Sequence, residues 1–414
     1  MTSSPRHTVT SIPGLVFILA GLTALAPLAT DAYLPAIPTM AEALGHSVHE
    51  VELSISLFLA GFSLGQLFGG PFSDQFGRRL AILTGLLLFA AGSLAIIFTP
   101  NIEWLWAFRV IQALGGGLTV VNTPAIVRDI SSGQDSARTL SRMAMILMLA
   151  PLLAPVFGSL ILQTLGWPMI FGLLFIYSLA MALTIYRVLP ETRRIQADRP
   201  SALRRYGMVL RHRHALGYLF SACLGYGSLF AFITGSPSVY MGYFELSETL
   251  YPLAFGSNVI AILAFNKLNI HLLGRHKPRS LLLLGQMIQM GAALVLFAYI
   301  YFSSEPQVWM FVPLVVVFFG CHGLVSANTM AGITEFFPTN SATATALMGA
   351  SGFAFGAFTG SMVGIYADGT PLPMVTTMTL CALLAPALRL LLQRGPTPAI
   401  QPEAQAGSSV RPSS

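Results

Sequence analysis

The sequence is poor in charged residues. Only 9% of its 414 residues are Asp, Glu, Lys or Arg, whereas 54% are hydrophobic. Globular domains in water carry about 25% charged residues, so this composition excludes a chain that folds mainly in water. Most of its length is therefore expected to contact a lipid bilayer. Because a helix satisfies its own backbone hydrogen bonds in lipid, we predict an all-α membrane protein.

Cysteine is also scarce, and several catalytic motifs are missing. Cys223, Cys321 and Cys381 all stand within apolar runs, which suits small hydrophobic residues and argues against a disulfide or metal framework. The sequence has no Walker motif, no H-E-x-x-H and no G-x-S-x-G. These absences exclude ATP hydrolysis as an energy source and argue against an enzyme. No cofactor is expected.

Twelve apolar stretches are each long enough to cross a bilayer, which takes about 20 helical residues. They are predicted at 14–36, 51–71, 79–98, 103–126, 140–163, 168–188, 214–236, 250–268, 280–302, 307–332, 342–365 and 373–393. An arginine-rich linker separates the sixth stretch from the seventh. We therefore expect an N-terminal six-helix bundle over 1–190, a basic linker over 191–213, a C-terminal six-helix bundle over 214–394 and a disordered tail over 395–414.

The basic residues predict the orientation. If the N-terminus is cytoplasmic, the even-numbered connections hold nearly all of the 22 Lys and Arg residues, and the outer loops hold none. Cytoplasmic loops are enriched in these residues, so both termini are expected in the cytoplasm of a bacterium, with the chain in its inner membrane. The net charge of +6 thus reflects topology, and nucleic acid is not expected as a partner.

A polar loop, GPFSDQFGRR, joins the second and third predicted spans. Gly77 permits a tight turn between antiparallel helices, while Asp74 and Arg78 can pair with a helix end or an opposite charge. Gly70, Asp74, Gly77, Arg78 and Arg79 match the pattern G-x-x-x-D-x-x-G-R-[RK]. In this loop the chain resembles the major facilitator superfamily, although Gln75 departs from the usual basic residue. The resemblance implies a gating loop at the cytoplasmic ends of the helices.

An arginine stands inside the fourth predicted span. Arg109, Gln112, Thr119 and Thr123 recur at helical spacing and share one face. We expect this face to line a water-filled cleft. A charge within a span is costly and indicates function; the alternative is an arginine that reaches out to the outer surface.

An aspartate lies near the end of the first predicted span, within the motif T-D-x-Y-L-P-A-x-P. Asp31 lies about seven residues before Pro38, roughly 10 Å deep at 1.5 Å per residue, and Arg109 lies at a similar depth. We expect these two side chains to pair and Asp31 to bind and release a proton as water and ligand come and go. A purely structural charge pair is the alternative.

The fifth predicted span carries A-P-x-x-A-P-x-x-G, with Pro151, Pro155 and Gly158. These residues predict a bent helix that packs closely against its neighbours. Together with the first-span motif and Val127-Arg128-Asp129, they resemble the bicyclomycin-resistance branch of the drug:proton antiporters. The resemblance implies two pseudo-symmetric six-helix bundles, the major facilitator fold. It also implies proton-driven export of small amphipathic compounds, a gating role for Asp129 and an antiporter helix at the fifth span.

Other polar residues leave more than one interpretation open. Tyr33, Asn258 and Asn328 can contact a small-molecule substrate or form hydrogen bonds between helices. His322 and Glu335 are titratable, and the sequence does not decide whether they take part in coupling. The same scaffold could instead carry a specific metabolite such as a nucleoside, sugar or amino acid. A monomer is expected to be functional.

Overall fold

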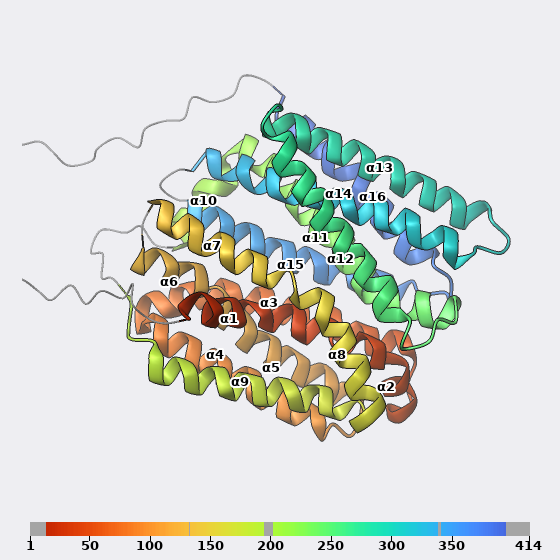
Figure 1. Cartoon of the computed structure of the whole chain (residues 1–414), viewed down its shortest axis with the longest axis horizontal. Coiled ribbons are helices and arrows are strands. Elements are labelled where there is room, and N and C mark those ends of the chain that lie inside the picture. Colours follow the sequence, from red (N-terminus) through yellow and green to blue (C-terminus); the bar gives the residue numbers. More distant parts are fainter. Residues whose placement is uncertain (1–13, 132, 194–201, 338–340, 395–414) are drawn as a thin grey trace, which may run out of the picture.

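The computed structural model describes residues 14–131, 133–193, 202–337 and 341–394, and this part contains helices and no strand. Figure 1 shows the helices lying roughly side by side along one common direction. Their bounds are α1 Leu15–Asp31, η2 Leu34–Ala36, α2 Ile37–Leu44, α3 Val48–Phe76, α4 Arg78–Ile97, α5 Ile102–Val120, α6 Thr123–Ile130, α7 Gly133–Leu147, α8 Ala150–Leu165, α9 Pro168–Val188, α10 Ala202–Arg211, α11 Arg213–Pro237, η3 Ser238–Tyr243, α12 Tyr251–Leu272, α13 Pro278–Phe302, α14 Val308–Glu335, α15 Ser341–Ile365 and α16 Leu372–Leu392.

All twelve predicted spans are present. In the described part of the chain, 12 segments are long and apolar enough to cross a membrane, so the predicted all-α membrane fold is confirmed. Figure 1 separates them into two groups, which we call the N-terminal half (α1 to α9) and the C-terminal half (α11 to α16). We call the end where α1 begins and α16 ends the termini end, and the opposite end the far end. The proposed tail over 395–414 lies outside the described residues.

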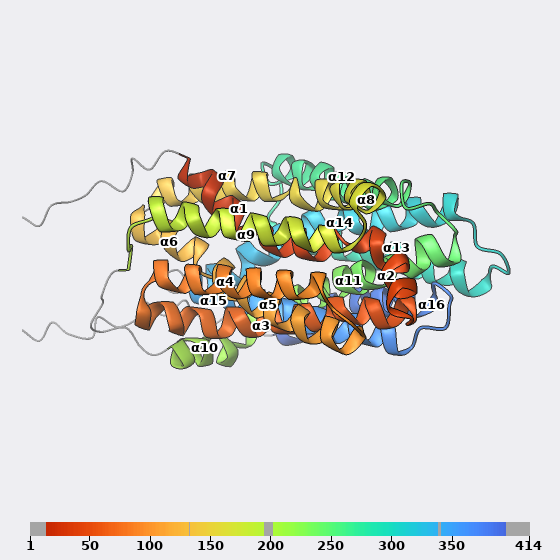
Figure 2. The same ribbon diagram turned by 90° about the horizontal axis from the view of Figure 1, so that it is seen from below.

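The two halves pack through a small number of helices. Within the N-terminal half α5 lies between α3 and α4, and within the C-terminal half α11 packs against α15 and α16. Contacts between the halves are made mainly by α3 with α15 and by α8 with α12. Figure 2 shows the same arrangement from below, with α1, α7 and α9 on one side and α3 on the other. The region between the halves is therefore bordered by different elements on its two sides.

Four of the spans are interrupted. The first breaks after Asp31, the fourth at Val121–Asn122, and the fifth at Met148–Leu149, just before Pro151. The seventh changes at Pro237 from α-helix to the π-helix η3. Proline lacks the backbone N–H and crowds the preceding turn, which accounts for breaks beside Pro35, Pro124 and Pro151. Carbonyl and amide groups at these breaks are free to bond side chains.

Candidate functional site

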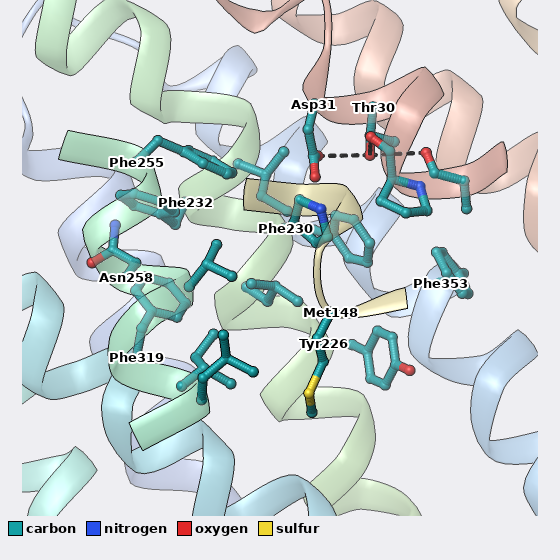
Figure 3. Close-up of a pocket in the computed structure, with 18 residues that line it drawn as sticks. Thr30, Asp31, Met148, Tyr226, Phe230, Phe232, Phe255, Asn258, Phe319 and Phe353 are labelled. Carbon is teal, nitrogen blue, oxygen red and sulfur yellow. Dashed lines mark hydrogen bonds between the residues drawn. The ribbon is translucent and has the colours of Figure 1, made fainter. Parts of the chain in front are cut away.

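A cavity of about 250 Å³ lies between the two halves. The N-terminal half contributes α1 and the start of α8, and the C-terminal half contributes α11, α12, α14 and α15. Most of the wall is apolar, and its aromatic side chains are Tyr226, Phe230, Phe232, Phe255, Phe319 and Phe353. Figure 3 shows these rings around the space into which the Asp31 carboxylate points. The cavity thus combines aromatic surface from one half with an acidic group from the other.

Asp31 is the last residue of α1 and is 2% exposed. The Thr30 hydroxyl donates a hydrogen bond to Asp31 Oδ1 at 2.7 Å. No lysine or arginine in the described ranges forms an ion pair with it. A carboxylate buried without a cation is costly, and within a membrane such a group indicates function. The structure places Asp31 in the cavity, and its role in proton coupling stays a prediction.

The predicted pair of Asp31 with Arg109 is not formed. Arg109 Nη1 instead donates to the Ala29 carbonyl at 3.0 Å and to Gln112 Oε1 at 2.6 Å. The guanidinium lies over the rings of Phe58 and Tyr33, with its carbon 4.4 and 4.6 Å from their centroids. Aromatic faces attract a cation and here occupy the place expected for a carboxylate. Arg109 is fully buried, so the alternative of an arginine reaching the surface is also wrong.

Arg109 bonds to the backbone close to Asp31. The Ala29 carbonyl belongs to the last turn of α1, where carbonyls lack partners within the helix. A cation at that end also interacts favourably with the helix dipole. Arg109 therefore caps the helix that presents Asp31, and it acts through the backbone and not as a counterion.

The polar face of the fourth span does not line this cavity. Gln112 Nε2 donates to Ser93 Oγ on α4 at 2.8 Å, and Thr119 Oγ1 donates to the Gly115 carbonyl. Thr123 Oγ1 donates to the Val120 carbonyl at 2.8 Å. The prediction of a cleft-lining face is wrong for this cavity because α5 packs between α3 and α4 and turns the face toward α4 and α1. Tyr33 likewise bonds Ser54 Oγ at 2.9 Å and stays within the N-terminal half.

The fifth span touches the break in the first. Pro151 lines the cavity, and Pro155 is buried inside α8. At Gly158 the two chains approach so closely that an added Cβ would lie 1.6 Å from the Ala32 carbonyl oxygen. No other residue fits there without a shift of backbone. The predicted antiporter helix thus packs directly on the residue that follows Asp31.

The two predicted asparagines lie in different places. Asn258 lines the cavity from α12, and its Oδ1 has no hydrogen-bond partner in the described part. Asn328 Nδ2 donates to Asn269 Oδ1 at 2.7 Å and to the Leu324 carbonyl at 2.8 Å. Asn328 is therefore an interhelical contact outside the cavity, as its alternative interpretation held. His322 lies against Gly225 and does not line the cavity either.

The predicted gating loop comes together at the termini end. Arg78 forms ion pairs with Asp74 Oδ1 at 2.9 Å and with Asp129 Oδ2 at 3.1 Å. These contacts join α3, α4 and α6. Gly77 has a φ of 101°, a conformation that favours glycine. Gly70 makes no close packing contact, since an added Cβ would meet only the Tyr206 hydroxyl at 4.0 Å.

Glu191 completes this cluster and was not predicted. Its carboxylate accepts the backbone N–H groups of Arg78 at 2.8 Å and Arg79 at 3.2 Å. A carboxylate at a helix N-terminus satisfies free donors and interacts favourably with the dipole. The Arg79 guanidinium lies over the Tyr186 ring, 5.1 Å from its centroid. In the sequence, Glu191 could have been noticed as an acidic residue at the end of the sixth span, at the start of a linker rich in arginine.

The aromatic wall of the cavity was also missed. Tyr226, Phe230 and Ile233 on α11 are spaced four and three residues apart, which places them on one helix face. That spacing is visible in the sequence. It could not be told from ordinary packing until the opposite half was placed against it.

Comparison with known proteins covers most of the chain. The profile described as Major Facilitator Superfamily matches residues 19–361. A protein of Haemophilus influenzae named bicyclomycin resistance protein homolog is 30% identical, over 89% of this chain and 94% of its own. A chloramphenicol resistance protein of Pseudomonas aeruginosa is 32% identical, over 61% of this chain and 60% of its own.

Solved structures share the fold. A bacterial homolog to the human lysosomal transporter Spinster, in an inward-facing and unoccupied conformation, aligns over 94% of this chain and 98% of its own, with a TM-score of 0.70 and 14% identity. A D-xylose-proton symporter aligns over 91% of this chain and 97% of its own, with a TM-score of 0.70 and 16% identity. At these identities the likeness concerns the arrangement of helices alone.

Proposed function

Because the chain belongs to the major facilitator superfamily, we propose that it is a proton-coupled antiporter that exports small amphipathic compounds, drugs among them, by alternating access. The names of relatives that confer resistance to bicyclomycin and chloramphenicol support this proposal. They agree with the resemblance that the motifs of the first and fifth spans indicated. The chain is a transporter, and we propose that it catalyses no chemical reaction.

One observation carries the proposal: the cavity between the halves joins an aromatic wall to a single buried carboxylate, Asp31. Flat apolar compounds gain from burial against such rings. A sugar or nucleoside needs many hydrogen-bond partners when it leaves water, and apart from the Asp31 carboxylate this wall offers the side-chain polar groups of Thr30, Asn258 and Tyr226. The cavity therefore favours amphipathic compounds over the metabolite alternative.

Hydrogen bonds join the two halves at the far end. Thr39 Oγ1 of the N-terminal half donates to Glu248 Oε1 of the C-terminal half at 3.1 Å. Ser159 Oγ donates to the Glu248 carbonyl oxygen at 3.0 Å. Alternating access requires these bonds to break when the halves rock apart at this end.

In the proposed cycle Asp31 binds a proton and substrate by turns. Deprotonated Asp31 is open to substrate from the cytoplasm, and the halves then reorient toward the far end. A proton taken up there neutralises the carboxylate and favours release, because the neutral group no longer holds charged or polar parts of the substrate. Return with the proton and its loss to the cytoplasm complete one exchange.

Orientation and setting are part of the proposal. We place the termini end in the cytoplasm and the chain in the bacterial inner membrane, because the basic residues gather at the termini end. Arg78 and Arg79 begin α4 at that end, and Lys277 and Arg279 flank the first residue of α13 there. A monomer contains the whole cavity, so we propose that one copy is sufficient. Protons are the only coupling ion, and no cofactor takes part.

The test is accumulation of labelled antibiotics, lipophilic compounds and metabolites in cells with and without the protein. We expect lower accumulation of some amphipathic compounds, and loss of the difference once the proton gradient is collapsed. Asp31→Asn should remove gradient-driven export while leaving the protein folded in the membrane. Glu42→Gln, which removes an exposed carboxylate, is the matched control.

Two outcomes would contradict the proposal at different points. Gradient-driven export by Asp31→Asn at the normal rate would show that another group couples the proton. Altered accumulation of a nucleoside, sugar or amino acid alone would favour the metabolite alternative.

A further inference from the structure

Glu52 is a buried acidic residue that the cavity does not use. It is the fifth residue of α3, near the far end, and its side chain is fully buried. The structure places it in the first turns of this helix and at the boundary between the two halves.

Its carboxylate bonds to the opposite half. Glu52 Oε1 accepts the backbone N–H of Ser238 at 2.9 Å. Ser238 is the first residue of the π-helix η3, immediately after Pro237, so the bond falls where the seventh span changes its winding. A hydrogen bond from an amide to an ionised carboxylate is about twice as strong as one to a neutral acceptor. This contact therefore holds the halves together most firmly while Glu52 is ionised.

The second carboxylate oxygen of Glu52 contacts a side chain that is partly exposed to solvent. His49 Nδ1 lies 3.2 Å from Glu52 Oε2, and the His49 side chain is 31% exposed. The other groups within electrostatic range are Tyr33 on the first span, Tyr251 on α12 and, acting on His49, Asp368 after α15. Over the residues that the structure places, no lysine or arginine pairs with Glu52. The carboxylate consequently has no permanent cation, and its one partner that can be charged is itself titratable.

We infer that Glu52 is a second proton-binding site of the transport cycle, which closes the far end while ionised and releases it when protonated from outside. A proton from water on the far side binds the His49 imidazole and passes to Glu52 Oε2. The imidazole is then neutral again, and the Ser238 N–H faces a neutral acid. The inference rests on the proposed proton-coupled transport and adds the step that opens the outer gate.

The site differs from Asp31 in what it senses. Asp31 faces the cavity, where substrate binds, whereas Glu52 lies outside the residues that line it. A proton at Asp31 competes with substrate, while a proton at Glu52 changes the contact between the halves. Two acids with separate tasks can make opening of the far end depend on outside acidity even when the cavity is empty.

The experiment measures the far end directly. Spin labels on Ala43→Cys in α2 and Ser304→Cys between α13 and α14 report the distance between the halves there, since both positions are exposed. The three native cysteines are buried and are replaced by serine or alanine. Distance distributions are recorded in lipid nanodiscs at pH 8 and pH 5.5, all in an Asp31→Asn background so that this group does not titrate.

We expect acid to shift the unsubstituted Glu52 protein toward the longer distance. Glu52→Gln, which resembles the protonated acid, should raise the ratio of open to closed molecules roughly tenfold at pH 8, the effect of losing one charge-assisted bond. It should also remove most of the response to acid. Glu42→Gln is the matched control, because it deletes an exposed carboxylate at the same end, and it should leave both distributions unchanged.

The result that overturns the inference is a Glu52→Gln protein whose distances and acid response equal those of the parent. A shift produced equally by Glu42→Gln would also overturn it, because general charge at this end would then suffice. The readout does not require export. If the accumulation assay shows no transport but the distances still respond to acid and to Glu52→Gln, the proposed substrate class is rejected. The inference about Glu52 is then still supported.

Discussion

Arg109 shows how a membrane-buried charge can be stabilised without an opposite charge. Its partners are the Ala29 carbonyl, the Gln112 side chain and the faces of aromatic rings. Two of its nitrogens, Nε and Nη2, have no hydrogen-bond partner among the described residues. An incompletely satisfied buried cation is costly, so its retention indicates a task other than stability. We assign that task to holding the end of α1, and with it Asp31.

Substitution of Arg109 should therefore reduce export more than it reduces stability. Arg109→Met keeps contact with the rings but leaves the Ala29 carbonyl and Gln112 Oε1 without the bonds that Arg109 donates, at about 1–3 kcal/mol each. This cost is partly offset because no unpaired charge is then buried. We expect export to fall at least tenfold and the melting temperature in detergent to change by only a few degrees.

Arg109→Lys separates charge from reach. The lysine keeps the positive charge, but its nitrogen ends one bond short of the position of Nη1, so we expect intermediate export. Export by Arg109→Met at the parent rate would remove Arg109 from the coupling machinery.

At the scale of single residues, the sequence predicted which side chains share a helix face better than it predicted which neighbouring helix that face contacts. The spacing of Arg109, Gln112 and Thr119 correctly placed them on one helix face. It could not say which neighbour that face meets, because this depends on how α5 is rotated between α3 and α4. Equal depth of Asp31 and Arg109 was likewise insufficient to predict an ion pair. Arg109 contacts the backbone of α1 at Ala29, whereas the Asp31 side chain points from α1 into the cavity.

At the scale of elements, Gly158 of the fifth span approaches the break in the first more tightly than any other described glycine approaches its neighbours. An added Cβ at Gly158 would lie 1.6 Å from the Ala32 carbonyl oxygen, so Gly158→Ala must push α8 away from α1. We expect a large loss of export and a lower melting temperature, since moving packed backbone costs typically 1–3 kcal/mol.

Gly291→Ala is the matched control. Gly291 lies within α13, and an added Cβ there meets no atom within 4 Å. Alanine favours a helix over glycine by about 0.5–1 kcal/mol, so this variant should export normally and melt slightly higher. If Gly158→Ala exports and melts like Gly291→Ala, the close approach of Gly158 to Ala32 is not needed for transport.

The positions of the twelve spans followed from the sequence, whereas the residues at which helices end and the groups that cap them followed only in part. The turn at Gly77 and the pairing of Arg78 with Asp129 agree with the predicted loop. Glu191 was not foreseen because it is distant in sequence from the helix whose N-terminus it caps. The break after Asp31 was foreseeable from Pro35 and Pro38, yet the residue that caps it, Arg109, comes from another span.

At the scale of the molecule, rocking of the two halves should be blocked by a covalent link between them. Ser56 on α3 and Gly360 on α15 face each other, and an added Cβ at Gly360 would lie 2.6 Å from Ser56 Oγ. Cysteines at both positions are therefore near disulfide geometry. We expect oxidation of the double variant to stop export and reduction to restore it, as measured by substrate accumulation.

Each single cysteine variant serves as its own control and should be insensitive to oxidant. A cross-linked protein, verified by a shift in mass after alkylation, that still exported at the parent rate would contradict motion between α3 and α15. Twelve spans and two halves could be read from composition and the basic linker. The cavity could not, because it forms between residues about two hundred positions apart.

The cavity takes its carboxylate from α1 and all six of its aromatic side chains from α11, α12, α14 and α15. In the proposed cycle, choice of substrate and use of the proton gradient are therefore encoded in separate halves of the gene. Mutations that enlarge or reshape the aromatic wall can change which compounds leave the cell while the energising step stays intact. A population under selection by a new toxin could thus adapt through the second half alone.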